Sequence, residues 1–252
     1  MSEFERLVED ALAAHFSGWD FSYLHGRQTE LNLPWDYRVQ VLKYLPLANS
    51  LLDMGTGGGE FLTSLVPLPN VTYATEGYAP NVAIARKRLA PFGITVFDTT
   101  ADEENEHLPF ENGALELIIN RHESYEPAEL YRILKPNGRF ITQQVGGADN
   151  VGLNHFLQGE GSYIDLEWQI EHEVERFETA GFEIEEAWEA HPETTFKDIG
   201  AVVYYLKAIP WQIEDFSVEK YYKQLLALHE HILDNNGFTL TSHRFFIRAL
   251  KL

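Results

Sequence analysis

The sequence predicts an α/β protein built on a doubly wound, mostly parallel sheet. Short apolar runs alternate with helical segments over residues 51–145, and this alternation is typical of parallel sheets with crossover helices. The first run, Leu51-Leu52-Asp53, is followed by glycines at 55, 57 and 59 and then by a helical pattern. Because ligands of such folds bind beyond the carboxyl ends of the strands, we expect the functional site at this edge of the sheet.

Each element of the first half follows from a local pattern. The breaker 67–70 ends the first helix, Pro80 marks the start of the second helix, and the turn 135–138 precedes the fifth strand. After the strand that ends at Asp53, the predicted strands are 71–76, 94–97, 114–120 and 139–145, and the predicted helices are 60–66, 79–89 and 127–134.

The flanking segments have their own patterns. Residues 3–16 have apolar side chains at helical spacing, which predicts a lid or packing helix, and 34–42 also predicts a helix. Past residue 150, the alternation of 183–189 indicates an edge strand. The other predictions there are helices at 171–180, 196–206 and 221–233, and a last hairpin of 238–240 with 245–250.

The glycine loop has the chemistry of a nucleotide or nucleoside site. Glycine adopts positive φ and lets a ligand approach the main chain where a Cβ would collide. A dinucleotide fingerprint, G-x-G-x-x-G, would need its third glycine at Glu60 or at Leu62. Glu60 would also put an anion beside an anionic pyrophosphate. The spacing therefore disfavours a nicotinamide-dependent dehydrogenase.

The order D-x-G-x-G-x-G over 53–59 resembles motif I of the class I S-adenosylmethionine-dependent methyltransferases. The likeness continues with an acid, Glu76, after the second strand, an acid followed by 108–110 (L-P-F), and K-P-N-G at 135–138, where the family usually has K-P-G-G. The resemblance implies a Rossmann-like methyltransferase fold with a seven-stranded sheet, and S-adenosyl-L-methionine as the cofactor. It also implies that the loop passes beneath the methionine part of the cofactor, whose ammonium and sulfonium groups favour nearby carboxylates.

The residues of the expected cofactor site follow from the loop and from the resemblance. Glu76 lies about 20 residues after the loop acid, the spacing at which a carboxylate accepts both ribose hydroxyls. Asp53 orients the loop and receives the methionine amino group, and Glu104 or Asp102 with Asn105 flanks the adenine. The full expected set is Asp53, Gly55, Thr56, Gly57, Gly59, Glu76, Gly77, Asp102, Glu104, Asn105 and Asn120.

Two histidines are the candidate catalytic residues. Methyl transfer is an in-line displacement, so a base is needed only when the acceptor carries a proton of high pKa. His122 follows the fourth strand, and His25 lies in a polar-aromatic loop beside Arg27. For each, a structural or surface role is the alternative. His191 has no companion at ligand spacing, and we expect no metal site.

Composition and charge narrow the class of partner. The net charge of −20, from 39 acidic and 19 basic residues, disfavours nucleic acid as the methyl acceptor. The chain has no cysteine, and it shows neither a signal peptide nor a membrane-spanning apolar run. We therefore expect a cytoplasmic protein, monomeric or homodimeric, that acts on a small molecule.

Our prediction is a single methyltransferase domain over 1–252. It consists of a helical cap (1–46), a cofactor-binding core (47–150) and an acceptor-side insertion with the last strands (151–252). Two alternatives stay open: a methyltransferase acting on RNA or protein, and a non-catalytic regulatory protein that binds S-adenosylmethionine. A cysteine-based zinc module, which a related family acting on ribosomal RNA guanine usually has, is missing from this chain.

Overall fold

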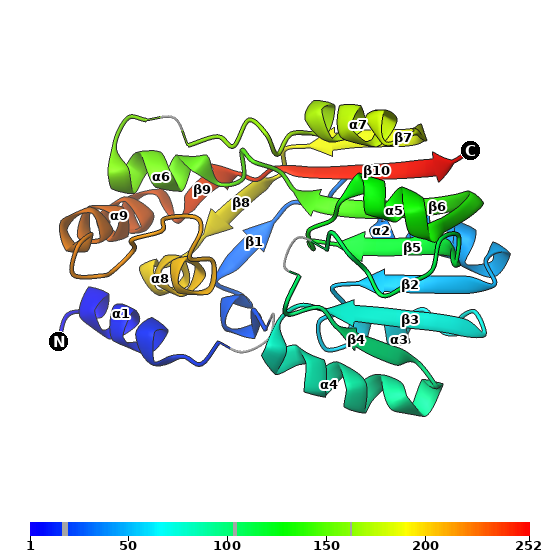
Figure 1. Cartoon of the computed structure of the whole chain (residues 1–252). Helices are drawn as coiled ribbons and strands as arrows, with labels where there is room; N and C mark the ends of the chain where they lie inside the picture. Colours follow the sequence, from blue (N-terminus) through cyan, green and yellow to red (C-terminus); the bar gives the residue numbers. More distant parts are fainter. Residues whose placement is uncertain (17–19, 103–104, 162) are drawn as a thin grey trace. The chain divides into compact units, whose positions relative to one another are not determined.

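The computed structural model describes residues 1–16, 20–102, 105–161 and 163–252, and these divide into two compact units (Figure 1). The large-sheet unit consists of Pro34–Gly146, Glu167–Ala190 and Arg244–Leu252. The small-sheet unit consists of Met1–Leu33, Gly147–Leu166 and His191–His243. The prediction of a single domain, with boundaries after 46 and 150, stays a prediction.

The large-sheet unit has a seven-stranded sheet in the order β4-β3-β2-β5-β6-β10-β7 (Figure 1). The first five strands in this order are parallel, and β10 runs antiparallel to both β6 and β7. The mostly parallel sheet predicted from the sequence is thus confirmed. The strands are β2 (Ser50–Met54), β3 (Val71–Glu76), β4 (Thr95–Asp98), β5 (Leu115–Arg121), β6 (Leu134–Val145), β7 (Phe182–Ala190) and β10 (Arg244–Lys251).

Helices flank this sheet, and the sheet is buried on both faces. One face packs against α5 and α7 through a cluster that includes Ile118, Phe140 and Phe177, while Leu51 and Ile119, which alternate to the other face, are also fully buried. Near that second face, Tyr37 of α2 packs against Phe61 of α3, with their ring centroids 5.4 Å apart. The helices are α2 (Tyr37–Tyr44), α3 (Glu60–Ser64), α4 (Ala79–Leu89), α5 (Pro127–Ile133) and α7 (Ile170–Thr179), with short 3-10 turns η2 (Leu45–Leu47) and η3 (Ala90–Phe92).

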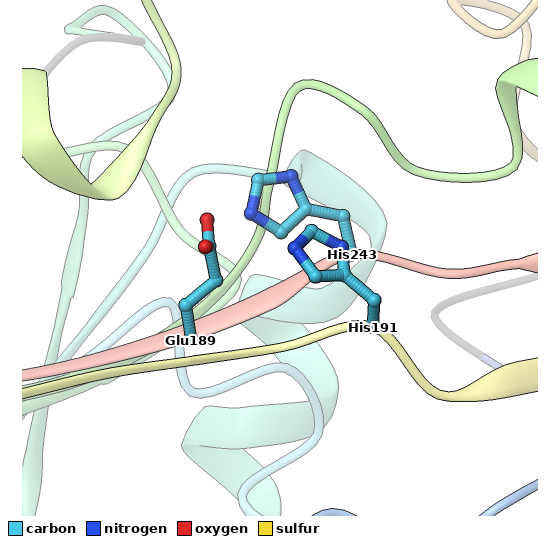
Figure 2. Close-up of side chains that lie close together, drawn as sticks. All are labelled: Glu189, His191 and His243. Atoms are coloured by element: carbon cyan, nitrogen blue, oxygen red, sulfur yellow. The ribbon is translucent and has the colours of Figure 1, made fainter.

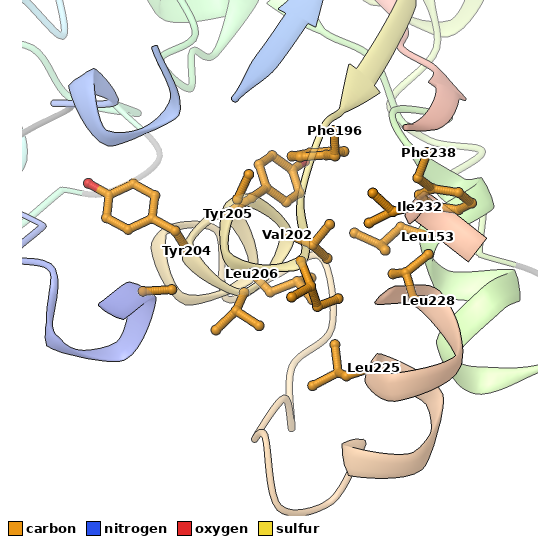
Figure 3. Packing of buried hydrophobic residues seen from close by; sticks show 14 of the residues in the cluster. Leu153, Phe196, Val202, Tyr204, Tyr205, Leu206, Leu225, Leu228, Ile232 and Phe238 are labelled. Atoms are coloured by element: carbon orange, nitrogen blue, oxygen red, sulfur yellow. The ribbon is translucent and has the colours of Figure 1, made fainter. Parts of the chain in front are cut away.

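The small-sheet unit has an antiparallel sheet in the order β1-β8-β9. Its core surrounds the apolar helix α8, as Figure 3 shows for Val202, Leu206 and their neighbours. Phe4 and Val8 of α1 belong to the same core, so α1 is a packing helix. The elements are α1 (Glu3–Ala13), η1 (Ser22–Leu24), β1 (Gln28–Glu30), α6 (Val151–Gln158), β8 (Glu193–Phe196), α8 (Ile199–Ala208), α9 (Tyr222–Asn235) and β9 (Phe238–Thr241).

Two predictions for the second half of the chain are wrong. The segments 238–240 and 245–250 do not form a hairpin, because β9 pairs with β8 in the small sheet and β10 pairs with β6 and β7 in the large one. The helix predicted from Phe196 begins only at Ile199, since Phe196 ends β8 and Asp198 is the N-cap, whose carboxylate accepts from the Ala201 N–H at 3.0 Å.

Candidate cofactor site of the large-sheet unit

The site lies where the strand order of the large sheet reverses. β3 and β4 lie on one side of β2, while the chain returns to the other side of β2 to add β5 and β6. Two loops therefore diverge at the carboxyl ends of β2 and β5, which is where ligands bind in open α/β sheets. The first of these loops begins at Gly55, and the second begins at His122.

Hydrogen bonds from side chains fold the glycine loop back onto the sheet. Asp53 is buried, and its Oδ2 accepts a hydrogen bond from the Thr56 hydroxyl at 2.7 Å. The Thr56 N–H donates to the carbonyl of Thr75 in the neighbouring strand at 2.9 Å. Gly55, Gly57 and Gly59 all have positive φ, which the sequence of three alternating glycines allows.

The glycines of this loop have different surroundings. A Cβ on Gly57 would meet no atom within 4 Å, so the main chain is open to a ligand there. A Cβ on Gly59 would lie 2.9 Å from Leu89 Cδ2 of α4, so this position needs glycine for the packing of α3 against α4.

Glu76 lies at the end of β3 and joins this loop. Its Oε2 accepts from the Gly57 N–H at 2.6 Å, and its Oε1 accepts from the Tyr78 N–H at 2.8 Å. Gly77 follows directly, and a Cβ there would lie 3.6 Å from Thr99 Oγ1. Each carboxylate oxygen has a second lone pair, so the two backbone bonds leave acceptor capacity for ligand hydroxyls.

The pKa values of the two buried acids of the site, Asp53 and Glu76, are both raised. Burial is the main cause that raises the pKa of Asp53 to about 7, with a smaller contribution from Glu76 that the Thr56 hydrogen bond and Arg121 oppose. Burial likewise raises the pKa of Glu76 to about 7, and the nearby Glu123 adds to this shift. Such acids hold a proton near neutral pH and release it when a cation approaches.

The residues expected at the adenine have distinct local roles. Both carboxylate oxygens of Asp102 accept backbone N–H groups, from Glu106 at 3.0 Å and His107 at 2.8 Å. Asn105 is buried with φ 54°, and its Oδ1 has no hydrogen-bond partner among the described residues. Glu104, the other expected acid, lies outside the described residues.

Asn120, at the end of β5, is fully buried and organises the second loop. Its Oδ1 accepts from Gln144 Nε2 at 2.7 Å and from the Thr142 hydroxyl at 3.1 Å. Its Nδ2 donates to the carbonyl of Glu123 at 3.2 Å. The Tyr37 hydroxyl donates to the carbonyl of Asn120 at 2.8 Å and accepts from its N–H at 3.1 Å. These polar groups satisfy one another. Asn120 thereby fixes the loop that follows β5 through its bond to the carbonyl of Glu123.

Glu123 is a residue of the site that the sequence analysis did not single out. A Cβ on Gly55 would lie 2.4 Å from Glu123 Oε2, so the two loops meet at this contact. The only sequence signal was the unbroken polar run 120–124 after a buried strand.

The two candidate catalytic histidines belong to different units. His122 has φ 65° and an exposed side chain in the large-sheet unit. Desolvation, together with the cations Arg121 and Arg244, lowers the pKa of His122 below its ordinary value. His25 is exposed in the small-sheet unit, directly after η1.

A histidine pair lies in the small-sheet unit. The expectation that His191 has no companion is wrong, because its ring centroid lies 4.8 Å from that of His243 (Figure 2). His243 is fully buried, and its Nδ1 accepts from the Ala148 N–H at 3.2 Å. That bond places the proton of the neutral ring on Nε2, where a metal ion would need a lone pair. We therefore assign no metal to this pair.

Comparisons with known proteins agree with this fold. Residues 52–142 match the family model described as a methyltransferase domain. No curated protein matches the sequence. A protein of inferred methyltransferase function from Bacillus halodurans C-125 has a TM-score of 0.57 at 16% identity, with 85% of this chain and 98% of that chain covered.

Two further solved structures share the fold. The [4+2]-cyclase SpnF has a TM-score of 0.53 at 17% identity, with 97% of this chain and 92% of that chain covered. A Haloferax volcanii protein of inferred methyltransferase function, in complex with the activator Trm112, has a TM-score of 0.52 at 17% identity, with 99% and 98% covered.

The segment that matches the family model contains the glycine loop and Glu76, together with Asn120 and Glu123. A segment of this chain thus matches a methyltransferase domain, and the solved structures share its fold. In the described residues, every helix is too short or too polar to cross a lipid bilayer.

Proposed function

We propose that this enzyme transfers a methyl group from S-adenosylmethionine to a small-molecule acceptor, and that the cofactor binds over the glycine loop. The observation that carries the proposal is the meeting of Asp53, Glu76 and the open main chain of Gly57 at the point where the sheet reverses its strand order. A cationic, hydroxyl-bearing ligand suits this set of groups because it supplies both positive charge and donors to buried carboxylates.

The described residues fit the parts of such a cofactor. Glu76 would accept from the ribose hydroxyls with the lone pairs that its two backbone bonds do not use. The buried Oδ1 of Asn105 would accept from the adenine amine, which would satisfy an atom that otherwise has no partner among the described residues. Thr56 and Gly59 would not contact the cofactor themselves but would maintain the conformation of the glycine loop, Thr56 through its bond to Asp53 and Gly59 through its packing against Leu89.

Positioning would provide most of the rate enhancement. The bound cofactor supplies a methyl group that its sulfonium activates, so the chain's task is to orient the acceptor in line and to exclude water. The lowered pKa of His122 makes its imidazole a weaker base than an ordinary histidine. We propose that it hydrogen-bonds the acceptor. The alternative role of His25 as the base would show as a loss of turnover in His25→Gln with cofactor affinity unchanged.

The charge of the chain supports a small acceptor. A net charge of −20 repels the phosphates of RNA or DNA along most approaches. The likeness to a structure described as a [4+2]-cyclase means that fold alone does not fix the reaction, so the test must follow the methyl group itself.

The test uses methyl-labelled S-adenosylmethionine and a cell extract separated into small molecules, RNA and protein. We expect label to appear in the small-molecule fraction with the wild-type chain and not with Glu76→Ala, the matched variant with weakened cofactor binding. Label in RNA or protein would replace the small-molecule proposal by that acceptor class. Cofactor that binds but yields no labelled product in any fraction would overturn turnover itself.

A further inference from the structure

We propose that the outward surface of α4 in the large-sheet unit binds an acidic segment of another protein. Such a partner goes beyond the proposed function, which concerns only the cofactor and the methyl acceptor. This α4 face consists of Pro80, Ala83, Ile84 and Lys87, and it is flanked by Arg86 and Arg88.

The helical period defines the α4 face. α4 packs beside β3 and β4 (Figure 1), and Val82, Ala85 and Leu89 are its buried apolar side chains. Because successive residues of an α-helix are about 100° apart, the side of the helix opposite these residues contains positions 80, 83, 84 and 87. All four positions are exposed. The α4 face therefore points away from the sheet and is accessible to a partner.

The centre of the α4 face is apolar. The outward side of a surface helix is usually polar, but Pro80, Ala83 and Ile84 carry no polar side chain. Ile84 is 47% exposed, and Phe92 in η3, directly after α4, is 49% exposed. A single exposed apolar side chain is ordinary, whereas an apolar centre with charged neighbours has the composition of a protein interface.

The charge of the α4 face is opposite to that of the chain as a whole. Residues 77–97 contain no acidic residue, and they include Arg86, Lys87 and Arg88. This segment thus carries a charge of +3, while the net charge of the whole chain is −20. A basic surface attracts an acidic partner, and the acidic remainder of the chain repels the same partner elsewhere, so binding is directed to one place.

The cations of the α4 face are available to a partner. No hydrogen bond or ion pair engages Lys87 among the described residues. Arg88 pairs with Glu60 at 2.6 Å, but both side chains are exposed, and a surface pair of this kind contributes little free energy. The Arg86 Nε donates to the carbonyl of Val96 at 3.4 Å, which leaves the two Nη groups of Arg86 as donors.

A second copy of this chain does not fit the α4 face. Most homodimers are isologous, and an isologous contact would place this basic surface against itself. A membrane or a nucleic acid is also disfavoured, because α4 is only about 16 Å long and an extended anionic surface would reach the acids around it. Glu60 and Asp98 are two of these acids, and both are exposed. A short acidic segment with apolar side chains matches both the charge and the size of the face.

The experiment uses the full chain with a photo-crosslinking residue, p-benzoylphenylalanine, in place of Ala83. Irradiation in a cell extract should link the chain to a protein, and mass spectrometry of the adduct should identify the attached segment as rich in Asp and Glu. A synthetic peptide of that segment is then the probe for affinity. We expect Lys87→Glu to weaken peptide binding by about three- to tenfold, and added NaCl to weaken peptide binding to the wild-type chain.

Two variants on the exposed side of α9 are the matched controls. Lys223→Glu makes the same change of charge on another exposed helix, and it should bind the peptide as the wild type does. Ile84→Ser removes the apolar centre of the α4 face and should also weaken binding, whereas Leu226→Ser, at a position that is 37% exposed, should not. All four positions lie on the surface, so we expect the variants to keep the denaturant midpoint of the wild type.

Several results would overturn the proposal. An adduct with a second copy of the chain, with RNA or with lipid would give the α4 face a different occupant, and the absence of any adduct would show a face without a partner. An attached segment that is not acidic would contradict recognition by charge. Equal affinities of Lys87→Glu and Lys223→Glu for the peptide would show that the basic residues of α4 do not bind it.

Discussion

The Gly57 N–H donates to the Glu76 carboxylate at 2.6 Å, and this bond ties the end of β3 to the loop that follows β2. The same carboxylate receives the Tyr78 N–H, so two backbone donors fix its plane. A carboxylate held in this way loses little conformational entropy when a ligand binds, which makes it suited to a ribose.

Replacing Glu76 by alanine should weaken cofactor binding by about 1.5–3 kcal/mol, because a charged hydrogen bond is lost. Calorimetric titration with S-adenosylmethionine measures the change. Asp98→Ala is the control, since Asp98 ends the neighbouring strand β4 but is exposed, and its carboxylate accepts from the local Thr100 N–H at 3.1 Å. An affinity in Glu76→Ala equal to that of the wild type would remove Glu76 from the site.

The contribution of Asp53 and Glu76 to the stability of the chain without cofactor should fall as pH rises from about 4 to about 7. The folded-state pKa values of Asp53 and Glu76, both about 7, lie above their ordinary values of 3.8 and 4.5. In this window the folded chain binds more protons than the unfolded chain, so each step upward in pH favours unfolding. Urea unfolding across the window, with Asp53→Asn/Glu76→Gln as comparison, should show a smaller pH dependence in the variant. Equal slopes would contradict the raised pKa values.

Cofactor binding should release protons near neutral pH. A cationic ligand favours the charged forms of Asp53 and Glu76, so it should lower both pKa values and displace the protons that they carry at about pH 7. Affinity should then rise between about pH 6 and 8. Titrations in buffers of different ionisation enthalpy count the protons directly. A heat that does not depend on the buffer would rule this coupling out.

Two glycines of the loop should respond differently to alanine. Gly59→Ala brings a Cβ to 2.9 Å from Leu89, at φ +83°, and should lower the free energy of unfolding by about 1–3 kcal/mol. Gly57→Ala, at φ +61° with nothing within 4 Å, should lose only about 1–2 kcal/mol from backbone strain. The larger effect of Gly57→Ala should be on cofactor affinity. Chemical denaturation measures the loss of stability, and calorimetric titration measures the loss of cofactor affinity. A larger loss of affinity in Gly59→Ala than in Gly57→Ala would contradict this assignment.

Tyr37→Phe should lower the free energy of unfolding by about 1–3 kcal/mol, because it leaves the buried N–H and C=O of Asn120 without their hydroxyl partner. Tyr78→Phe is the control, since Tyr78 is 48% exposed. Denaturant midpoints provide the measurement. If the two variants were equally stable, water would have to satisfy Asn120 in place of Tyr37.

Most of the large sheet could be predicted from the sequence because its signals are local. The apolar runs that become β2, β3, β4 and β5 are separated by helical patterns, and Gly, Pro and Asn mark the turns. The edge strand at 183–189 also followed from alternation, and it lies at the end of the sheet as β7.

The second sheet could not be predicted, because its information is not local. Only two residues, Ser242 and His243, separate β9 from β10, and this spacing favours a hairpin. The two strands instead continue in different sheets, with partners 42 to 48 residues away along the chain for β9 and 54 to 111 residues away for β10. Glu123 was missed for a related reason, since its meeting with Gly55 joins residues far apart in sequence.

The place of β10 within the large sheet has a consequence for biosynthesis. A strand formed by Arg244–Lys251 separates β6 from β7, so neither of these strands has its full set of partners until the ribosome has released residue 251. The large-sheet unit cannot finish folding before β10 has been synthesised, and the edges of β6 and β7 that β10 covers remain open until then. Expression of this protein should therefore depend on chaperones that bind exposed strands, and on the speed with which the last strand reaches its place.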